Sequence, residues 1–80
     1  MSSHLDSQDR DCLDQLRRSN GESVQDLCID FGVTATAIRQ RLSRLLQKRL
    51  VTRETVRLEG RGRPRHVYHV TDRGLKELGN

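Results

Sequence analysis

The stretch "SVQDLCIDFGVTATAIRQRLSRLLQKR", residues 23–49, contains two runs of apolar residues at helical spacing with a glycine between them. Apolar residues at i, i+3, i+4 and i+7 form one face of a helix. Ser23 is predicted to cap the first helix, because Asp26 follows three residues later, with Asp replacing the usual Glu of a capping box. Gly32 can take the left-handed backbone conformation that ends a helix in a tight turn. The apolar residues of this first helix are Val24, Leu27, Cys28 and Phe31.

The second run predicts a longer helix over residues 35–49, capped by Thr34. At about 100° per residue, the apolar and polar side chains fall on opposite sides of this helix. The apolar side carries Ile38, Leu42, Leu45 and Leu46, and it is flanked by Arg39 and Arg41. The outward side carries hydroxyl, amide and guanidinium groups but no carboxylate, and consists of Thr36, Gln40, Ser43, Arg44 and Gln47.

Two short helices joined by a glycine-containing turn, the second polar and basic on its outside, are typical of a helix-turn-helix. In the major groove of DNA, arginine can bind guanine and glutamine can bind adenine, whereas a carboxylate would be repelled by the bordering phosphates. Thr34 and the free amides at the helix start can hold a phosphate. We therefore predict contacts to DNA from Thr34, Thr36, Arg39, Gln40, Ser43 and Arg44.

The net charge of +4 is distributed unevenly along the chain. Residues 1–30 carry seven acids and three arginines, which gives −4, and residues 31–80 carry twelve bases and four acids, which gives +8. Between Asp30 and Glu54 there are six bases and no acid. Charged surfaces that are merely solvated normally mix both signs, so this block indicates a surface for a polyanion, with nucleic acid as the favoured partner.

After the helix-turn-helix the periodicity of apolar residues changes from helical to alternating. Strand-like runs over residues 51–58 and 66–70 predict an antiparallel hairpin that spans about residues 51–70. The segment between the strands, residues 59–65, is too long for a tight turn and indicates a projecting loop.

Helices are also predicted toward both ends of the chain. The first runs from about Gln8 to Ser19, and the last begins at Thr71 or Asp72. Residues 1–80 are therefore expected to form one α+β domain. In this fold a three-helix core is followed by a two-stranded β-hairpin and a short C-terminal helix.

The loop of the hairpin concentrates positive charge. Its string "RGRP", residues 61–64, also occurs at the heart of AT-hook peptides, which lie along the minor groove of A·T-rich DNA. Glycine permits close approach, proline stiffens the chain, and arginine is attracted to the negative potential of a narrow minor groove. Arg61, Arg63 and Arg65 are therefore predicted to contact DNA, by insertion into the minor groove or through phosphates alone.

A helix-turn-helix followed by a two-stranded wing is the winged helix-turn-helix arrangement, and the chain resembles that family along nearly all of its length. It resembles the DNA-binding domains of bacterial repressors of iron-sulfur cluster assembly and of arsenic-repressor-like regulators. The resemblance rests on residues 24–51 and on "GRGRPRHVYHVTDRGLKEL", residues 60–78. It implies a transcriptional regulator with recognition helix 35–49 in the major groove and loop 59–65 at the minor groove. The family positions matched in the second stretch are Gly62, Arg63, Pro64, Tyr68, Val70, Thr71 and Gly74.

The chain also departs from those repressors. They carry a C-terminal sensory domain with a cysteine cluster, and this chain is expected to lack one because it ends at Asn80. Cys12 and Cys28 lie on apolar helix faces and are predicted to be core residues, since two thiols cannot supply the four of a cluster. His66 and His69 should point to opposite faces of a strand and cannot chelate one ion together. No cofactor and no metal is expected.

These patterns predict a sequence-specific, double-stranded DNA-binding transcriptional regulator in the cytoplasm, associated with the nucleoid. The alternative is a winged helix that serves as a protein-interaction or assembly module without direct DNA binding, although such interfaces usually carry apolar residues where this chain has polar ones. An enzyme is not expected, because no cluster of acid, base and nucleophile is visible. No membrane association is expected, since no run approaches roughly 18 apolar residues. Two copies are expected to pair through the first and last helices, with Cys12, Leu13, Leu16, Leu75 and Leu78 as the partner face.

Overall fold

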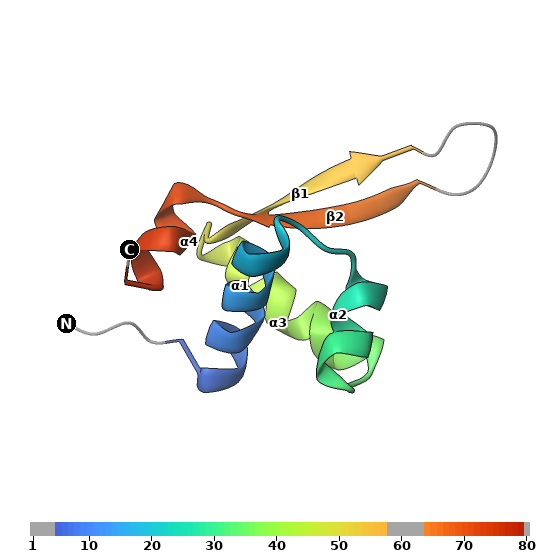
Figure 1. Ribbon diagram of the computed structural model, residues 1–80, viewed down its shortest axis with the longest axis horizontal. Helices are drawn as coiled ribbons and strands as arrows, with labels where there is room; N and C mark the ends of the chain where they lie inside the picture. The colour runs from blue at the N-terminus through green and yellow to red at the C-terminus, as the bar shows by residue number, and fades with distance from the viewer. Residues whose placement is uncertain (1–4, 58–63, 80) are drawn as a thin grey trace.

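The computed structural model describes residues 5–57 and 64–79 of the chain. Three helices come first, followed by two antiparallel strands and a short helix (Figure 1). The two strands cross over the helices and extend past the second of them. This order is the α+β arrangement that the sequence predicts. The elements are α1 (Ser7–Ser19), α2 (Val24–Phe31), α3 (Ala35–Gln47), β1 (Val51–Val56), β2 (Arg65–Val70) and α4 (Asp72–Glu77).

The starts of α2 and α3 are fixed by side chains that cap them. Ser23 Oγ accepts a hydrogen bond from the Asp26 amide, and Asp26 Oδ2 accepts one from the Ser23 amide, each at 3.3 Å. Thr34 Oγ1 accepts a hydrogen bond from the Ala37 amide at 3.2 Å. These bonds satisfy amides that have no partner within the helix. The predicted capping box of α2 and threonine cap of α3 are therefore confirmed.

The end of α3 differs from the predicted one. The helix stops at Gln47 rather than at Arg49. Arg49 has a φ of 62°, in the left-handed region, and so cannot continue a right-handed helix. The Leu50 amide donates a hydrogen bond to the Leu45 carbonyl oxygen at 2.9 Å across this turn. The turn leads the chain directly into β1.

The two strands form an antiparallel hairpin. Their six residue pairs run from Val51 opposite Val70 to Val56 opposite Arg65. Residues directly opposite each other in such a ladder share one face of the sheet. β1 is shorter than the predicted strand 51–58, whose last residue lies outside the described part of the chain.

Glu22, in the segment between α1 and α2, forms backbone hydrogen bonds with the hairpin. Its amide donates a hydrogen bond to the Tyr68 carbonyl oxygen at 3.2 Å, and its carbonyl oxygen accepts one from the Tyr68 amide at 2.8 Å. This single bridge pairs with β2 on the side that β1 leaves open. The sequence pattern did not predict it.

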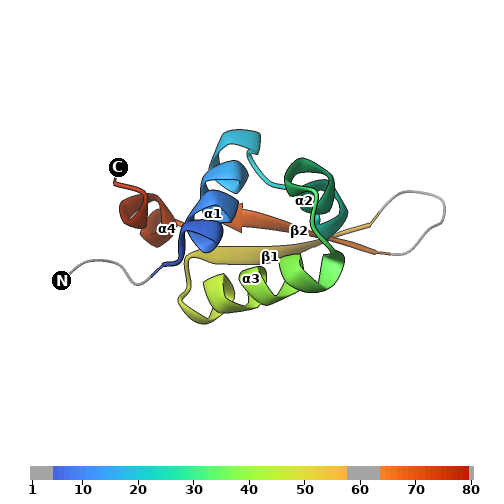
Figure 2. The ribbon, with the colours of Figure 1, turned by 90° about the horizontal axis from the view of Figure 1, so that it is seen from below.

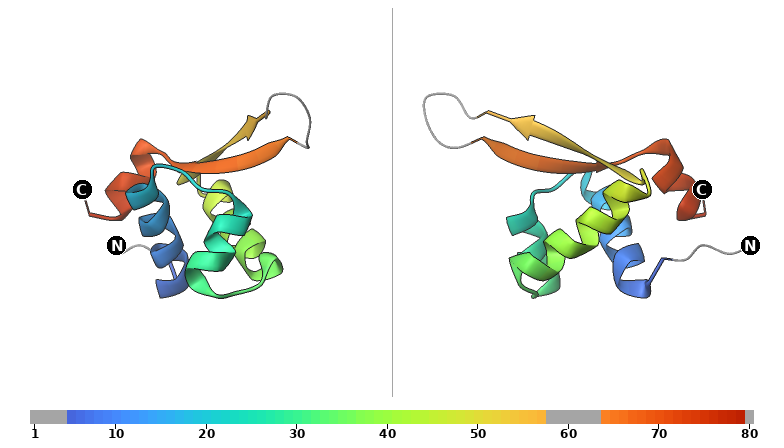
Figure 3. Two further views of the ribbon diagram at one scale, coloured as in Figure 1. Left: turned by 45° about the vertical axis from the view of Figure 1, so that its right-hand side comes forward. Right: turned by 180° about the vertical axis from the view of Figure 1, so that it is seen from behind.

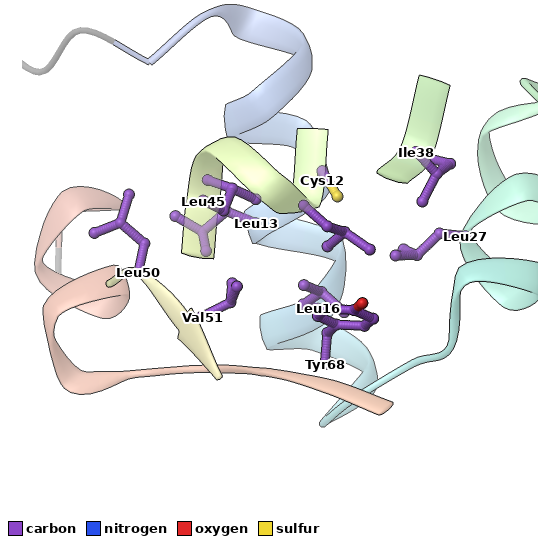
Figure 4. Close-up of a cluster of buried hydrophobic side chains, with 10 residues drawn as sticks. Cys12, Leu13, Leu16, Leu27, Ile38, Leu45, Leu50, Val51 and Tyr68 are labelled. Carbon is purple, nitrogen blue, oxygen red and sulfur yellow. The ribbon is translucent and has the colours of Figure 1, made fainter. Parts of the chain in front are cut away.

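The helices enclose a small apolar core beneath the base of the hairpin (Figure 4). Replacing a leucine buried in such a core by alanine typically costs about 2–5 kcal/mol. α4 packs closely against this core, because a Cβ atom at Gly74 would collide with the Leu50 carbonyl oxygen. The buried apolar residues are Cys12, Leu13, Leu16, Leu27, Ile38, Leu42, Leu45, Leu50, Val51 and Tyr68.

The packing of α1 corrects the predicted face for pairing. Cys12, Leu13 and Leu16 are at most 1% exposed, so they face the interior of their own chain and cannot contact a second copy. The three residues were expected at a partner face because an apolar stripe alone does not say what covers it. Leu75 on α4 and Leu78 just after it are half-buried, and pairing through this end of the chain stays a prediction.

Candidate nucleic-acid interface

α3 exposes its polar side along one side of the molecule. Seen from below, α3 lies on one side and α1 and α2 lie on the other (Figure 2). Seen from behind, α3 runs obliquely in front of them toward the base of the hairpin (Figure 3). Its apolar side packs into the core. The structure therefore gathers on and beside this helix the exposed residues Thr34, Thr36, Arg39, Gln40, Ser43 and Arg44, all predicted to contact DNA.

Arg39 and Arg44 lie on opposite flanks of this outward face. With about 100° of rotation per residue, Gln40 and Ser43 fall near its middle and the two arginines fall to either side. Arg39 lines a groove shared with the hairpin. Arg44 contacts α1 through Asp9. The outward face is therefore neutral and polar in its middle and basic along both edges.

Arg44 is held by a bidentate ion pair that the sequence did not predict. Its Nε donates a hydrogen bond to Asp9 Oδ2 and its Nη2 donates one to Asp9 Oδ1, both at 2.8 Å. These hydrogen bonds raise the pKa of Arg44 above its ordinary value, so the guanidinium stays charged. The side chain of Asp9 is 2% exposed and that of Arg44 is 44% exposed. Arg44 thus belongs both to the exposed face and to a contact between helices.

A groove of about 750 Å³ lies between α3, the start of α2 and the hairpin. None of the described residues that line it is acidic. Its buried and half-buried lining includes Val24, Leu42, Leu46 and Tyr68. Its exposed basic lining consists of Arg39, Arg53, Arg65 and His66. The groove therefore combines an apolar lining with basic side chains from α3 and both strands.

The hairpin contributes arginines to the groove from both strands. Arg65, predicted to contact DNA, begins β2 and is exposed. Arg61 and Arg63 lie outside the described residues. Arg53 lines the groove although it was not predicted as a contact. The alternation of β1 could have identified it, because residues two apart on a strand share a face and Val51 points into the core.

Glu22 is a buried acid that the sequence analysis missed. It is 9% exposed, and its Oε2 accepts a hydrogen bond from Gln15 Nε2 at 2.8 Å. Its Oε1 has no hydrogen-bond partner among the described residues. Burial raises the pKa of the Glu22 carboxyl, and the nearby carboxyl of Asp30 acts in the same direction. No local pattern marks this burial, since β2 covers the residue from a distant part of the sequence.

Both cysteines are free thiols. Cys12 is a core residue as predicted, and Cys28 is half-buried against the core. Burial raises the pKa of the Cys12 thiol to about 11, although Arg41 acts in the opposite direction. Such a thiol stays protonated near neutral pH and is inert. Within residues 5–57 and 64–79, no group of three or more His, Cys, Asp or Glu side chains could hold a metal, and no helix is long and apolar enough to cross a membrane.

The arrangement has a counterpart among solved structures. The chain is similar to the crystal structure of the circadian clock associated protein Pex from Anabaena, with a TM-score of 0.67 and 21% sequence identity. The match covers 96% of this chain and 74% of the Pex chain. The fold is a winged helix-turn-helix. α2 and α3 form the helix-turn-helix, and β1 and β2 form the two strands of the wing.

The predicted fold class is therefore confirmed. No protein-family model matches the sequence, and no curated protein matches it. The finer resemblance to iron-sulfur assembly repressors and arsenic-repressor-like regulators stays a prediction, since a structural likeness at 21% identity establishes the fold alone.

Proposed function

We propose that the protein is a transcriptional regulator that binds double-stranded DNA sequence-specifically, with α3 in the major groove and the wing at the minor groove. The observation that carries this proposal is the charge of one continuous surface. No residue of α3 and no described residue lining the adjoining groove is acidic, while Arg39, Arg53 and Arg65 all lie there. A surface of this kind attracts a polyanion.

The outward face of α3 has the groups needed to read bases. The major groove, about 12 Å wide, admits one α-helix and presents hydrogen-bond donors and acceptors on base edges. Gln40 and Ser43 lie in the middle of the face, where such edges would be, and Arg39 and Arg44 lie on its flanks, where an arginine can meet a base edge or a bordering phosphate. Thr34 caps the start of the helix, which favours a phosphate at its free amides.

The groove between α3 and the wing suits one sugar–phosphate strand. A DNA strand alternates weakly polar sugars with charged phosphates, which complements an apolar lining edged by arginines. Each phosphate that an arginine neutralises releases counterions and strengthens binding at low salt. With a strand in this position, we propose that Arg61, Arg63 and Arg65 bind at the adjoining minor groove.

DNA fits this surface better than a protein partner does. Assembly modules bind through apolar surface patches. Among the described residues, Ile29 is the only large apolar residue that is exposed, with 80% of its surface accessible. Single exposed apolar residues are common on monomers and form no docking surface. The likeness to Pex contributes only the fold, so DNA as the partner rests on the residues of this chain.

Selection from a library of randomised DNA duplexes tests the proposal. The protein should enrich one sequence class, which we term the selected duplex. Fluorescence anisotropy should then show tighter binding to the selected duplex than to a scrambled duplex of equal composition, with a steep loss of affinity as salt rises. A library that stays random, or equal affinity for the two duplexes, would contradict sequence-specific binding.

A further inference from the structure

The ion pair between Asp9 and Arg44 joins α1 to α3, and its two side chains differ greatly in exposure. The side chain of Asp9 is 2% exposed, whereas that of Arg44 is 44% exposed. Carboxylates are seldom buried so completely unless they are paired, because taking a charge out of water is costly. Both oxygens of Asp9 accept from Arg44, one from Nε and one from Nη2, at 2.8 Å each. Both oxygens of the buried Asp9 carboxylate therefore bind the exposed Arg44 side chain.

The pair leaves part of the guanidinium free. A guanidinium has five N–H groups in one plane. Asp9 accepts from the Nε–H and from one Nη2–H, so both N–H groups of Nη1 and the second of Nη2 have no hydrogen-bond partner among the described residues. Bidentate pairing fixes both the position and the plane of the group. Arg44 therefore presents a fixed edge of donors on an exposed part of α3.

This edge lies on the flank of α3 that is opposite the wing. Arg39 lies on the other flank and lines the groove, and the neutral residues Gln40 and Ser43 lie between the two arginines. A helix in the major groove lies over base edges and has one phosphate strand on each side of it. The two arginines are consequently placed toward the two sides of the groove, and among the described residues an acid holds Arg44 but not Arg39.

We propose that Asp9 is a positioning residue for DNA recognition, which orients Arg44 so that its free edge meets base edges in the major groove. This inference rests on the proposed function. The side chain is ordered on folding rather than on binding, so binding loses less conformational entropy. Asp9 also offsets the charge of Arg44, which reduces attraction to DNA of any sequence. The pair therefore favours directional contacts over non-specific ones.

The variant Asp9→Asn separates positioning from charge. It keeps the size of the side chain and makes the protein one unit more positive. Charge alone predicts tighter binding to every duplex. Positioning predicts that affinity for the selected duplex falls by about two- to tenfold, the cost of ordering one long side chain, while affinity for the scrambled duplex does not fall. Anisotropy titrations at fixed salt measure both affinities.

Asp14→Asn is the matched control. It makes the same charge change on α1, but Asp14 pairs with Arg17 at 2.7 Å and Arg18 at 3.0 Å, both on its own helix. It should leave the ratio of the two affinities unchanged. In an Arg44→Gln background, Asp9→Asn should likewise change the ratio no further. An unchanged ratio in Asp9→Asn, or an equal change with and without Arg44, overturns the proposal.

Circular dichroism checks that each variant folds. If Asp9→Asn does not fold, Arg44→Lys decides the matter, because lysine keeps the charge but loses the planar fork. That variant should also lower the ratio, and a retained ratio would overturn the positioning role. Failure of the proposed function is distinguishable from these outcomes, since it appears in the unmodified protein as a lack of preference for any duplex.

Discussion

Arg39 lies where the outward face of α3 meets the groove. From this corner its guanidinium can reach either a base edge in the major groove or a phosphate of a strand in the groove. The two contacts differ in what they recognise, because phosphates are the same in every sequence and base edges are not. A substitution at Arg39 can therefore distinguish the reading of bases from attraction to the DNA phosphates.

Replacing Arg39 or its neighbour Gln40 by alanine should weaken binding to the selected duplex more than binding to a scrambled one. Each bidentate contact to a base discriminates by about 1–3 kcal/mol, which sets the expected loss. Anisotropy titrations of both duplexes measure it. Arg73→Ala, which removes the same charge from an exposed position on α4, is the control for Arg39→Ala. Equal losses on the two duplexes would show that this face does not read bases.

At the scale of elements, the sequence predicts best what depends on neighbours in the chain. Ser23 and Asp26 are three residues apart, and their pattern alone indicates the start of α2. The contact between Asp9 and Arg44 spans 35 residues. α1 carries other acids, so no pattern says which of them meets α3. Helices, hairpin and the exposed face of α3 were therefore predictable, whereas the contacts between elements were not.

The wing allows a prediction about salt. Replacing Arg61, Arg63 and Arg65 by alanine removes three cations, and each phosphate contact contributes about −0.9 to the slope of log affinity against log salt. The slope should therefore become shallower by about 2–3, and the preference for A·T-rich flanks should fade with it. Titrations over a range of salt concentrations, on duplexes with A·T-rich and G·C-rich flanks, measure both effects.

The thermal midpoint of this triple variant should change little, since Arg65 is exposed and the wing is anchored at its base by Tyr68. A second variant with Arg17, Arg18 and Arg73 replaced by alanine loses the same charge from exposed positions on α1 and α4. It should keep the slope of the unmodified protein. Should the wing variant keep both its slope and its A·T preference, α3 would be binding DNA without the wing.

At the scale of the whole molecule, charge is divided between two parts. Residues 1–30, which form α1 and most of α2, carry a net −4, and residues 31–80 carry a net +8. α1 and α2 lie on the side away from α3 (Figure 2). Such a division gives the molecule an electric dipole. The field of an approaching polyanion therefore turns the basic side of the molecule toward it before contact is made.

The stability of the whole molecule should depend on Glu22. Burial raises the pKa of this carboxyl above its ordinary value of 4.5. The folded state therefore holds the proton more firmly than the unfolded state, so the ionised Glu22 costs stability at neutral pH. That cost should diminish as pH falls through the raised pKa toward 4.5. Glu22→Gln should consequently raise the midpoint of thermal unfolding at pH 7, by an amount that shrinks on acidification.

Thermal unfolding followed by circular dichroism from pH 7 to about pH 4.5 measures this difference. Asp11→Asn makes the same charge change on the exposed side of α1 and should leave the midpoint nearly unchanged at pH 7. A lower midpoint for Glu22→Gln at pH 7 would mean that the ionised carboxylate stabilises the fold, against the direction expected from its burial.

Tyr68 gives the molecule an optical property of its own. It is the single tyrosine of the chain, which contains no tryptophan. The residue is 7% exposed, closes the core from β2 and also lines the groove. Ultraviolet light absorbed by tyrosine is therefore emitted from one place, the wall between core and groove. Without any attached dye, the fluorescence of Tyr68 should change when the core unfolds. It should also change when a ligand occupies the groove.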